Sequence, residues 1–337
     1  MKFKTTRRQA VKVSPTDLVK VTLFQPEQPL PLVIQPAVEG INLVTWVASN
    51  RDLIETWLLQ HGGILFRNFD ITEVTQFEQF IQTISGQLLD YSYRSTPRSQ
   101  VSGKIYTSTE YPATQSIPLH NEMAYSLSWP MKIWFCCLKS AHYGGQTPIA
   151  DSRRVLQRID PKIKDKFIKK KVMYVRNYVD KLDLSWENVF QTKNKLELEQ
   201  YCQNAGIEFE WKKGNHLRTR QVCQAVATHP KTGETVWFNQ AHLFHVSSLN
   251  SEVQQTLLSI MEEADIPRNA YYGDGSPIEA SVLDEIREIY NQETVIFSWQ
   301  EGDILMLDNM ISAHGRKPFI GARKVIVGMA EPVVISK

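Results

Sequence analysis

The chain has 337 residues, of which 42% are hydrophobic and 22% are charged, and its formal net charge at pH 7 is +2. This composition is typical of a soluble globular protein with a large core, and the near-neutral charge gives no support to a nucleic-acid or membrane-surface partner. The sequence has no run of eighteen apolar residues and no apolar signal core in its basic N-terminal stretch, so we expect a cytoplasmic protein.

The four cysteines are predicted to be buried thiols. Cys136 and Cys137 are adjacent within an apolar run, Cys202 and Cys223 stand alone, and no Cys-x-x-Cys spacing occurs. This pattern argues against a disulfide scaffold and a structural zinc site, and it favours a reducing compartment.

The N-terminal stretch differs in composition from the rest of the chain. Residues 1–35 combine basic side chains with prolines and are predicted to form an extended lead-in. Residues 36–337 are predicted to form a single domain with an insertion at about residues 180–220, in which a helix precedes an alternating strand.

Hydrophobic periodicity assigns the regular elements in chain order. Helices are predicted after Asn50 and over residues 72–85, 151–171, 196–204, 251–264 and 276–291. Strands are predicted at 62–69, 129–138, 172–178, 207–211, 225–228, 234–238, 294–299, 303–307 and 323–330, and a long polar loop at 92–118. Strands dominate the middle and the end, which favours an α+β fold with an antiparallel core covered by helices. No glycine-rich nucleotide-binding motif occurs.

A candidate metal site starts at His120 and Glu122. Side chains two residues apart on an extended segment point to the same side, so both can reach one ion while Asn121 points away, and Pro118 makes a helix here improbable. His314, after the apolar strand at 303–307, supplies a second imidazole. Two imidazoles and one carboxylate on one face of an ion is the arrangement of non-haem Fe(II) oxygenases.

Other interpretations remain open on these residues alone. His120 and Glu122 are most simply an ordinary pair in a loop. The His-Glu-x-x-His motif of zinc hydrolases is absent, and the pair His242 and His245 has no carboxylate at a useful spacing.

Four stretches carry a resemblance to a known family. They are Leu119-His-Asn-Glu122, Gly144-Gly-Gln-Thr147, Ala227–Glu234 with Val236–Asn239, and His314–Arg323. In this set and order the sequence resembles the TauD/TfdA (taurine dioxygenase-like) Fe(II)- and 2-oxoglutarate-dependent oxygenases, most of all members that tailor amino acids in nonribosomal peptide and other natural-product pathways. The resemblance implies a double-stranded β-helix (jelly-roll) core with flanking helices. It also implies Fe(II), 2-oxoglutarate and O2, with His120, Glu122 and His314 as iron ligands.

The resemblance also implies how 2-oxoglutarate is held. Arg323 would bind its distal carboxylate, which suits a planar donor with permanent charge, and Thr147 would donate its hydroxyl to the same group. Arg316 would be a second anion contact or, equally, a residue that supports the others.

The expected substrate is a small molecule, an amino acid or an amino-acid-derived intermediate, free or tethered to a carrier protein. Glu122 stands where halogenating relatives have a small residue, so the resemblance implies hydroxylation. Desaturation, epoxidation and a non-catalytic jelly-roll binding protein are the alternatives. Arg218, Arg220, Asn239 and Tyr125 are candidate substrate residues, although each could equally face solvent or pack. A homo-oligomer is left open.

Overall fold

The computed structural model describes residues 15–90, 93, 98–108, 111–179 and 182–334. Its largest element is an eight-stranded sheet. In spatial order the strands are β1 (Val19–Gln25), β2 (Gln28–Pro36), β3 (Gly63–Phe66), β16 (Ile304–Asp308), β7 (Ser128–Lys139), β19 (Lys324–Val334), β5 (Ile105–Thr107) and β4 (Gln100–Ser102). Neighbouring strands are antiparallel except β2 and β3, which are parallel.

Helices cover one face of this sheet: α1 (Leu43–Ala48), α2 (Arg51–His61) and α3 (Val74–Ser85). Successive side chains of a strand point to opposite sides, so β7 serves two cores. Trp134 packs among the helices, whereas Phe135 belongs to the core on the other face. β7 is therefore buried on both faces, as the apolar run at 129–138 predicted.

A smaller antiparallel sheet carries two of the candidate metal ligands. Its order is β6 (Ile117–His120), β17 (Ser312–Arg316) and β9 (Ile149–Asp151). A further pair joins β8 (Tyr143–Gly144) to β18 (Phe319–Ile320). These pairings bring three of the four motif regions close together. The fourth forms a separate hairpin of β13 (Val226–Thr228) and β14 (Thr235–Trp237).

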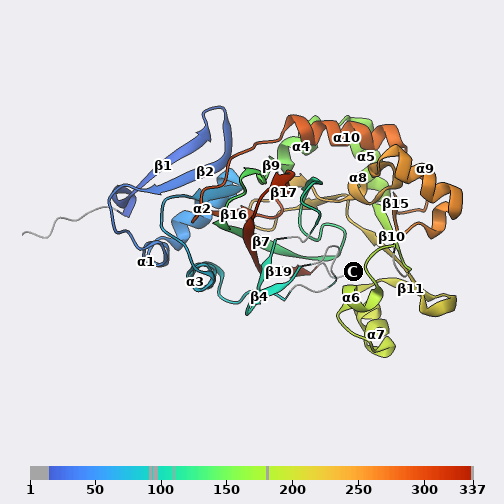
Figure 1. Ribbon diagram of the computed structural model, residues 1–337. Helices are drawn as coiled ribbons and strands as arrows, with labels where there is room; N and C mark the ends of the chain where they lie inside the picture. Colours follow the sequence, from blue (N-terminus) through green and yellow to red (C-terminus); the bar gives the residue numbers. More distant parts are fainter. Residues whose placement is uncertain (1–14, 91–92, 94–97, 109–110, 180–181, 335–337) are drawn as a thin grey trace, which may run out of the picture.

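The remaining elements surround a second, four-stranded sheet. Its order is β11 (Glu208–Trp211), β12 (Leu217–Cys223), β10 (Val172–Tyr178) and β15 (Arg268–Tyr272). The helices are α4 (Ser152–Arg158), α5 (Pro161–Lys170), α6 (Trp186–Phe190), α7 (Lys195–Ala205), α8 (Ala241–Phe244), α9 (Ser251–Ile260) and α10 (Ala280–Gln292), with 3-10 turns at Pro15–Leu18, Lys213–Asn215, Val246–Ser248 and Glu263–Asp265. Figure 1 shows this sheet at the end of the molecule opposite to the β1–β2 hairpin.

Two stretches differ from the prediction in the first half of the chain. The predicted lead-in contains the β1–β2 hairpin, which joins the main sheet through the pairing of β2 with β3; its first fourteen residues lie outside the described part. The predicted polar loop contains β4 and β5, which pair at the edge of the same sheet. Each of the two stretches forms a local pair of strands, and one strand of each pair joins the main sheet through a strand from elsewhere in the chain, β2 through β3 and β5 through β19.

Boundaries also differ in the C-terminal half. The helix predicted to start at residue 276 begins at Ala280, because the Ser276 backbone N–H bonds instead to Asp274 Oδ1 (3.0 Å) and Pro277 forms a bridge with Tyr271. Residues 294–299 contribute a single bridge, at Val295, instead of a strand. The strand β17, which holds His314 itself, was not predicted.

The cysteine prediction is confirmed, because all four cysteines are buried and free. In the described part of the chain, no helix has the length and apolar character needed to span a membrane.

Candidate metal centre and its cavity

The three predicted metal ligands converge where β6 meets β17. His314 is the register partner of His120, and Glu122 follows two residues after β6 ends. The two imidazole ring centroids are 4.5 Å apart, and one ligand atom from each of the three residues lies within 4.8 Å of the others. Among the described residues, this is the one group of His, Cys, Asp or Glu side chains that could hold a metal ion.

Asn309 fixes the backbone that carries Glu122. Its side-chain oxygen accepts the Glu122 backbone N–H at 2.7 Å, and its amide nitrogen donates to the Glu122 carbonyl at 2.9 Å. Asn309 is fully buried between β16 and β17, so it ties the carboxylate to the strands that lead to His314. Asn121 donates to the Asn309 carbonyl at 2.7 Å, and its side chain is directed away from the ligands, as the alternation predicted.

Hydrogen bonding and burial prepare the imidazoles for a metal. The Nδ1 of His120 lies 2.8 Å from the Pro118 carbonyl oxygen, which places the proton on Nδ1 and leaves the Nε2 lone pair for an ion. Burial is the largest cause that lowers the pKa of His120, and it lowers the pKa of His314 well below its ordinary value. Both rings are therefore neutral at neutral pH, and this is the form that binds metal.

Arg98 holds the carboxylate ligand. Its Nη2 lies 2.6 Å from Glu122 Oε2, and each of the two side chains is 3% exposed. The same carboxylate oxygen is 3.8 Å from His314 Nε2. No local signal marks this residue in the sequence, because it stands in a stretch of polar residues without periodicity.

The residues present fit an Fe(II) ion. Two neutral imidazoles and one carboxylate are the donor set that this ion prefers, and their placement on one side leaves positions for other ligands on the cavity side. The scaffold that orients them consists of backbone carbonyls and the buried Asn309 amide, which is the support that metal ligands usually have.

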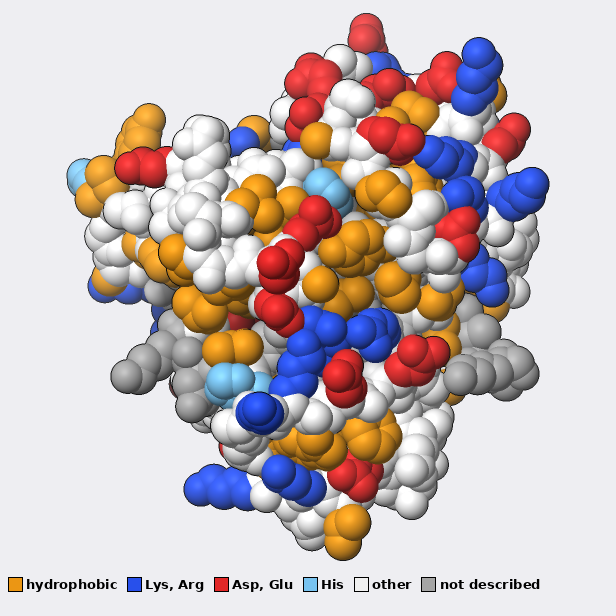
Figure 2. Space-filling view, turned by 90° about the vertical axis from the view of Figure 1, so that its right-hand side faces the viewer, with side chains coloured by type: hydrophobic (Ala, Val, Ile, Leu, Met, Phe, Trp, Pro, Cys, Tyr) orange, Lys and Arg blue, Asp and Glu red, His pale blue; other side chains and the backbone are white. Residues whose placement is uncertain are grey.

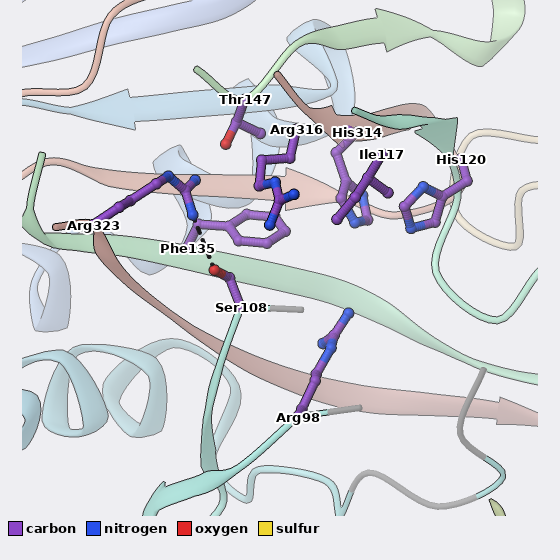
Figure 3. A pocket seen from close by; sticks show the side chains of 10 residues that line it. Arg98, Ser108, Ile117, His120, Phe135, Thr147, His314, Arg316 and Arg323 are labelled. Atoms are coloured by element: carbon purple, nitrogen blue, oxygen red, sulfur yellow. Dashed lines mark hydrogen bonds between the residues drawn. The ribbon is translucent and has the colours of Figure 1, made fainter. Parts of the chain in front are cut away.

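An anion site lies at the other end of the same cavity. Figure 3 shows Arg323 and Thr147 at one end and His120 and His314 at the other. The Nε of Arg323 donates to the Gly145 carbonyl at 3.0 Å, and its Nη1 donates to the Ser108 hydroxyl at 3.1 Å. Burial and then the charge of Arg316 lower the pKa of Arg323 to about 10, so the guanidinium stays charged at neutral pH.

The Gly-Gly turn before Thr147 is required by its backbone. Gly144 and Gly145 have backbone φ values of +74° and +70°, which residues with a Cβ atom rarely adopt. A Cβ on Gly144 would lie 2.1 Å from the Pro318 carbonyl oxygen, and one on Gly145 would lie 3.0 Å from Cδ of Arg323. The glycines therefore let the turn pack directly against the segment that carries the arginine.

Trp299 orients the hydroxyl of Thr147. Its indole N–H donates to Thr147 Oγ1 at 3.1 Å. Because the hydroxyl oxygen accepts this bond, the hydroxyl proton is directed elsewhere and can be donated to a ligand in the cavity that Thr147 lines. Trp299 was not predicted as a site residue, since a tryptophan at the end of an apolar run usually indicates core packing.

Arg316 lines the cavity and also supports its wall. Its guanidinium donates to the carbonyl oxygens of Tyr111 (2.9 Å), Pro112 (2.7 Å) and Gln115 (2.8 Å). These bonds anchor the segment that precedes β6. Of the two roles predicted for Arg316, the supporting one is the role that its contacts favour.

Tyr125 and Asn239 are buried near the centre but do not line this cavity. The Tyr125 hydroxyl donates to the Tyr93 carbonyl at 2.9 Å, and its ring packs on that of Phe244. Asn239 donates to the Ala225 carbonyl at 2.8 Å and accepts a backbone N–H, so it is engaged in holding the hairpin.

Arg218 and Arg220 lie elsewhere. Both are on β12 of the four-stranded sheet, where they line a groove with apolar residues of β10. Arg218 forms an ion pair with Asp265, and Arg220 faces Glu210 at 3.7 Å. Figure 2 looks onto this end of the molecule and shows Lys and Arg side chains beside acidic and hydrophobic ones. The structure does not bring these two arginines together with the metal ligands.

The competing pair of histidines has other partners. The Nε2 of His242 lies 3.0 Å from the Leu119 carbonyl oxygen, and burial lowers its pKa to about 3. The Nδ1 of His245 accepts the Ser247 backbone N–H at 3.1 Å. His242 therefore supports the strand that ends at His120.

Comparisons with known proteins agree with this geometry. The family model described as "Taurine catabolism dioxygenase TauD, TfdA family" matches residues 26–330. The dapdiamide synthesis protein DdaC of Enterobacter agglomerans is 41% identical over 311 residues, which cover 89% of this chain and 94% of that protein. A clavaminate synthase-like protein of Arabidopsis thaliana is 27% identical over 90% of this chain and 94% of its own length.

Solved structures show the same fold. PvcB of Pseudomonas aeruginosa, described as an Fe, alpha-ketoglutarate dependent oxygenase from an isonitrile synthetic pathway, has a TM-score of 0.55 at 13% identity, covering 96% of this chain and 94% of its own. The protein AAD-2, solved with Mn(II) and N-oxalylglycine, has a TM-score of 0.55 at 13% identity, covering 94% of this chain and 100% of its own.

Proposed function

This chain belongs to the TauD/TfdA family of dioxygenases, and we propose that it oxidises an amino acid or an amino-acid-derived intermediate in the biosynthesis of a natural product. It is an Fe(II)- and 2-oxoglutarate-dependent oxygenase, and O2 is its second co-substrate.

The proposed roles follow the two ends of the cavity. His120, Glu122 and His314 hold the iron, and Arg323 and Thr147 bind the distal carboxylate of 2-oxoglutarate. Bound iron and 2-oxoglutarate supply the activation of O2, with release of succinate and CO2. The protein fixes the ligands, neutralises the dicarboxylate and keeps the reacting groups in a buried cavity that excludes water.

One observation carries the proposal: Glu122 is present, buried and within reach of both imidazoles. A third protein ligand leaves no vacant position for a halide at this place, which supports oxygenation of the substrate, and hydroxylation is the outcome that we propose first. The kinship with a protein named for dapdiamide synthesis supports an amino-acid-derived substrate.

The same reasoning extends to architecture and location. We propose that the eight-stranded sheet and the β6–β17–β9 sheet are the two sheets of a double-stranded β-helix within a single domain that follows the lead-in. Four buried free thiols support a reducing compartment, and we propose the cytoplasm.

A succinate-release screen tests the substrate. Purified protein with Fe(II), ascorbate and 2-oxoglutarate is offered free amino acids in one arm and the same aminoacyl groups tethered to a carrier protein in the other. We expect succinate above the substrate-free rate with at least one amino-acid-derived compound, and none with the His120→Ala variant. Succinate in neither arm would contradict the proposed substrate class.

Mass spectrometry of the product separates the outcomes. Hydroxylation and epoxidation each add one oxygen atom, whereas desaturation removes two hydrogen atoms. An epoxide is distinguished by its opening with a thiol. A product that has lost two hydrogens would replace hydroxylation with desaturation while leaving the residue roles unchanged.

A further inference from the structure

The ion pair between Arg98 and Glu122 joins a cavity cation to a metal ligand. The guanidinium and the carboxylate are 2.6 Å apart, and both are almost fully buried. In Figure 3, Arg98 lies below His120 and His314, and its guanidinium points up toward the two imidazoles. The carboxylate oxygen that Arg98 contacts lies 3.8 Å from His314 Nε2, so the guanidinium is close to the proposed position of the metal.

Metal binding changes what Glu122 can offer to Arg98. Once the carboxylate is a ligand of a dication, its negative charge is shared, and the guanidinium and the ion repel each other at short range. A buried cation that loses the charge of its partner is costly, because the protein interior cannot replace the lost solvation. A second anion at the metal end would remove this cost.

The co-substrate brings two carboxylates into this cavity. Three arginines line it, namely Arg98, Arg316 and Arg323. Arg323 lies at the far end, and Arg316 is engaged with three backbone carbonyls. Arg98 contacts the metal ligand Glu122 and therefore reaches the metal end, where the keto-acid carboxylate must lie if the distal carboxylate is at Arg323.

We propose that Arg98 exchanges partners: it pairs with Glu122 in the metal-free protein and binds the keto-acid carboxylate of 2-oxoglutarate once iron has taken Glu122. This inference rests on the proposed roles of the two ends of the cavity. It makes Arg98 a binding residue for the co-substrate and couples the affinities for metal and 2-oxoglutarate.

Truncated analogues test the assignment by calorimetry on Fe(II)-loaded protein without O2. 2-Oxopentanoate keeps the keto-acid end and lacks the distal carboxylate, whereas levulinate keeps the distal carboxylate and has a methyl group at the keto-acid end. We expect Arg98→Gln to weaken 2-oxoglutarate and 2-oxopentanoate by roughly 10–100-fold and to leave levulinate unchanged. Arg323→Gln should weaken 2-oxoglutarate and levulinate and leave 2-oxopentanoate unchanged.

A metal titration without 2-oxoglutarate gives the second readout. Arg98→Gln should bind Fe(II) at least as tightly as the unaltered protein, because it removes a positive charge that competes for Glu122. Arg98→Lys, which keeps the charge with fewer donors, should recover part of the affinity for 2-oxoglutarate. Arg67→Gln is the matched control, since Arg67 pairs with Asp303 at 2.7 Å and does not line the cavity.

The outcomes separate the possible failures. If Arg98→Gln weakens the binding of metal, 2-oxoglutarate and levulinate equally, the residue has a structural role and the exchange is overturned. Unchanged affinity of this variant for 2-oxoglutarate would also overturn the exchange. Failure of the unaltered protein to bind Fe(II) and 2-oxoglutarate would overturn the proposed residue roles as well. Normal binding by the unaltered protein with an unaffected Arg98→Gln variant would overturn the exchange alone.

Discussion

Two groups of arginines show how the surroundings decide what a cation can do. In the cavity, the hydrogen bonds of Arg323 go to a carbonyl and a hydroxyl, which orient the guanidinium without cancelling its charge. On the four-stranded sheet, Arg218 and Arg220 face the carboxylates of Asp265 and Glu210. Arg323 is thereby prepared for an anionic ligand, whereas Arg218 and Arg220 are neutralised by their neighbours.

The same contrast applies to histidines. His314 is buried and His120 is half-buried; both are neutral, and their ligand atoms converge with a carboxylate oxygen of Glu122. His242 is buried, but its Nε2 is engaged by the Leu119 carbonyl. Convergence of free ligand atoms, more than residue type or burial, therefore distinguishes the site, and the following variants test this distinction.

The largest effect is expected from the metal ligands. His120→Ala or Glu122→Ala removes one of three protein ligands, and we expect Fe(II) binding and succinate formation to fall below detection. Metal content after anaerobic loading and a succinate assay measure this. His142→Ala, at an exposed histidine, is the control and should keep both. Unchanged turnover in His120→Ala would refute the metal site.

Arg323→Ala should weaken 2-oxoglutarate by about 100-fold, because a charge-assisted bond to a buried anion is worth roughly 1.5–3 kcal/mol. Fe(II) affinity should change little, since Arg323 lies at the far end of the cavity. Calorimetric titration of the Fe(II)-loaded variant measures both. Arg218→Ala is the matched control on the other sheet, and equal losses in the two variants would abolish the contrast between the two groups.

Asn309→Ala should weaken Fe(II) binding by roughly 10-fold, the lower range for residues that orient metal ligands. The variant removes the two side-chain bonds that hold the Glu122 backbone at 2.7 and 2.9 Å. Asn309→Asp keeps the acceptor and loses the donor, so it should retain part of the affinity. A metal affinity unchanged in Asn309→Ala would mean that β6 alone positions the carboxylate.

The parts of the candidate site that the sequence could predict have local signals or follow from the family resemblance. His120 and Glu122 stand two residues apart on an extended segment, whereas the role expected of Thr147 came from the resemblance of the Gly144–Thr147 stretch to the family. Long apolar runs such as 129–138 likewise identify a strand buried on both faces. The structure confirms the buried strand and brings His120 and Glu122 together with His314.

The parts that could not be predicted depend on tertiary pairing. Arg98, Trp299 and Asn309 act through partners more than twenty residues away, and nothing in their neighbourhoods marks them. β4 and β5 are short strands that exist because β5 pairs with β19. Arg218 and Arg220 were candidates by residue type alone, and the register of β12 places them on another sheet.

A smaller effect is expected at Trp299. Trp299→Phe removes the indole donor that orients the Thr147 hydroxyl at 3.1 Å while keeping an aromatic ring in the core. The loss of one neutral hydrogen bond corresponds to about 1 kcal/mol, so the KM for 2-oxoglutarate should rise about fivefold with kcat nearly unchanged. Thr147→Val should have at least this effect, and combining the two changes should add little. Additive losses would show that Trp299 does not act through Thr147.

The smallest effect is expected at Arg220, where the comparison between the two groups of arginines is most easily broken. Arg220 and Glu210 are 3.7 Å apart and 38% and 51% exposed, and such surface pairs contribute about 0–1 kcal/mol to stability. Arg220→Gln should therefore leave the melting temperature nearly unchanged. The kcat/KM for any substrate found in the succinate screen should stay within about twofold of that of the unaltered protein. A selective rise in the KM for that substrate, with unchanged affinity for 2-oxoglutarate, would mean that the groove on β12 binds part of the substrate or of its carrier. The ion pair of Arg220 with Glu210 would then exist only in the absence of substrate. The distinction between the two groups of arginines would likewise apply only to the protein without its substrate.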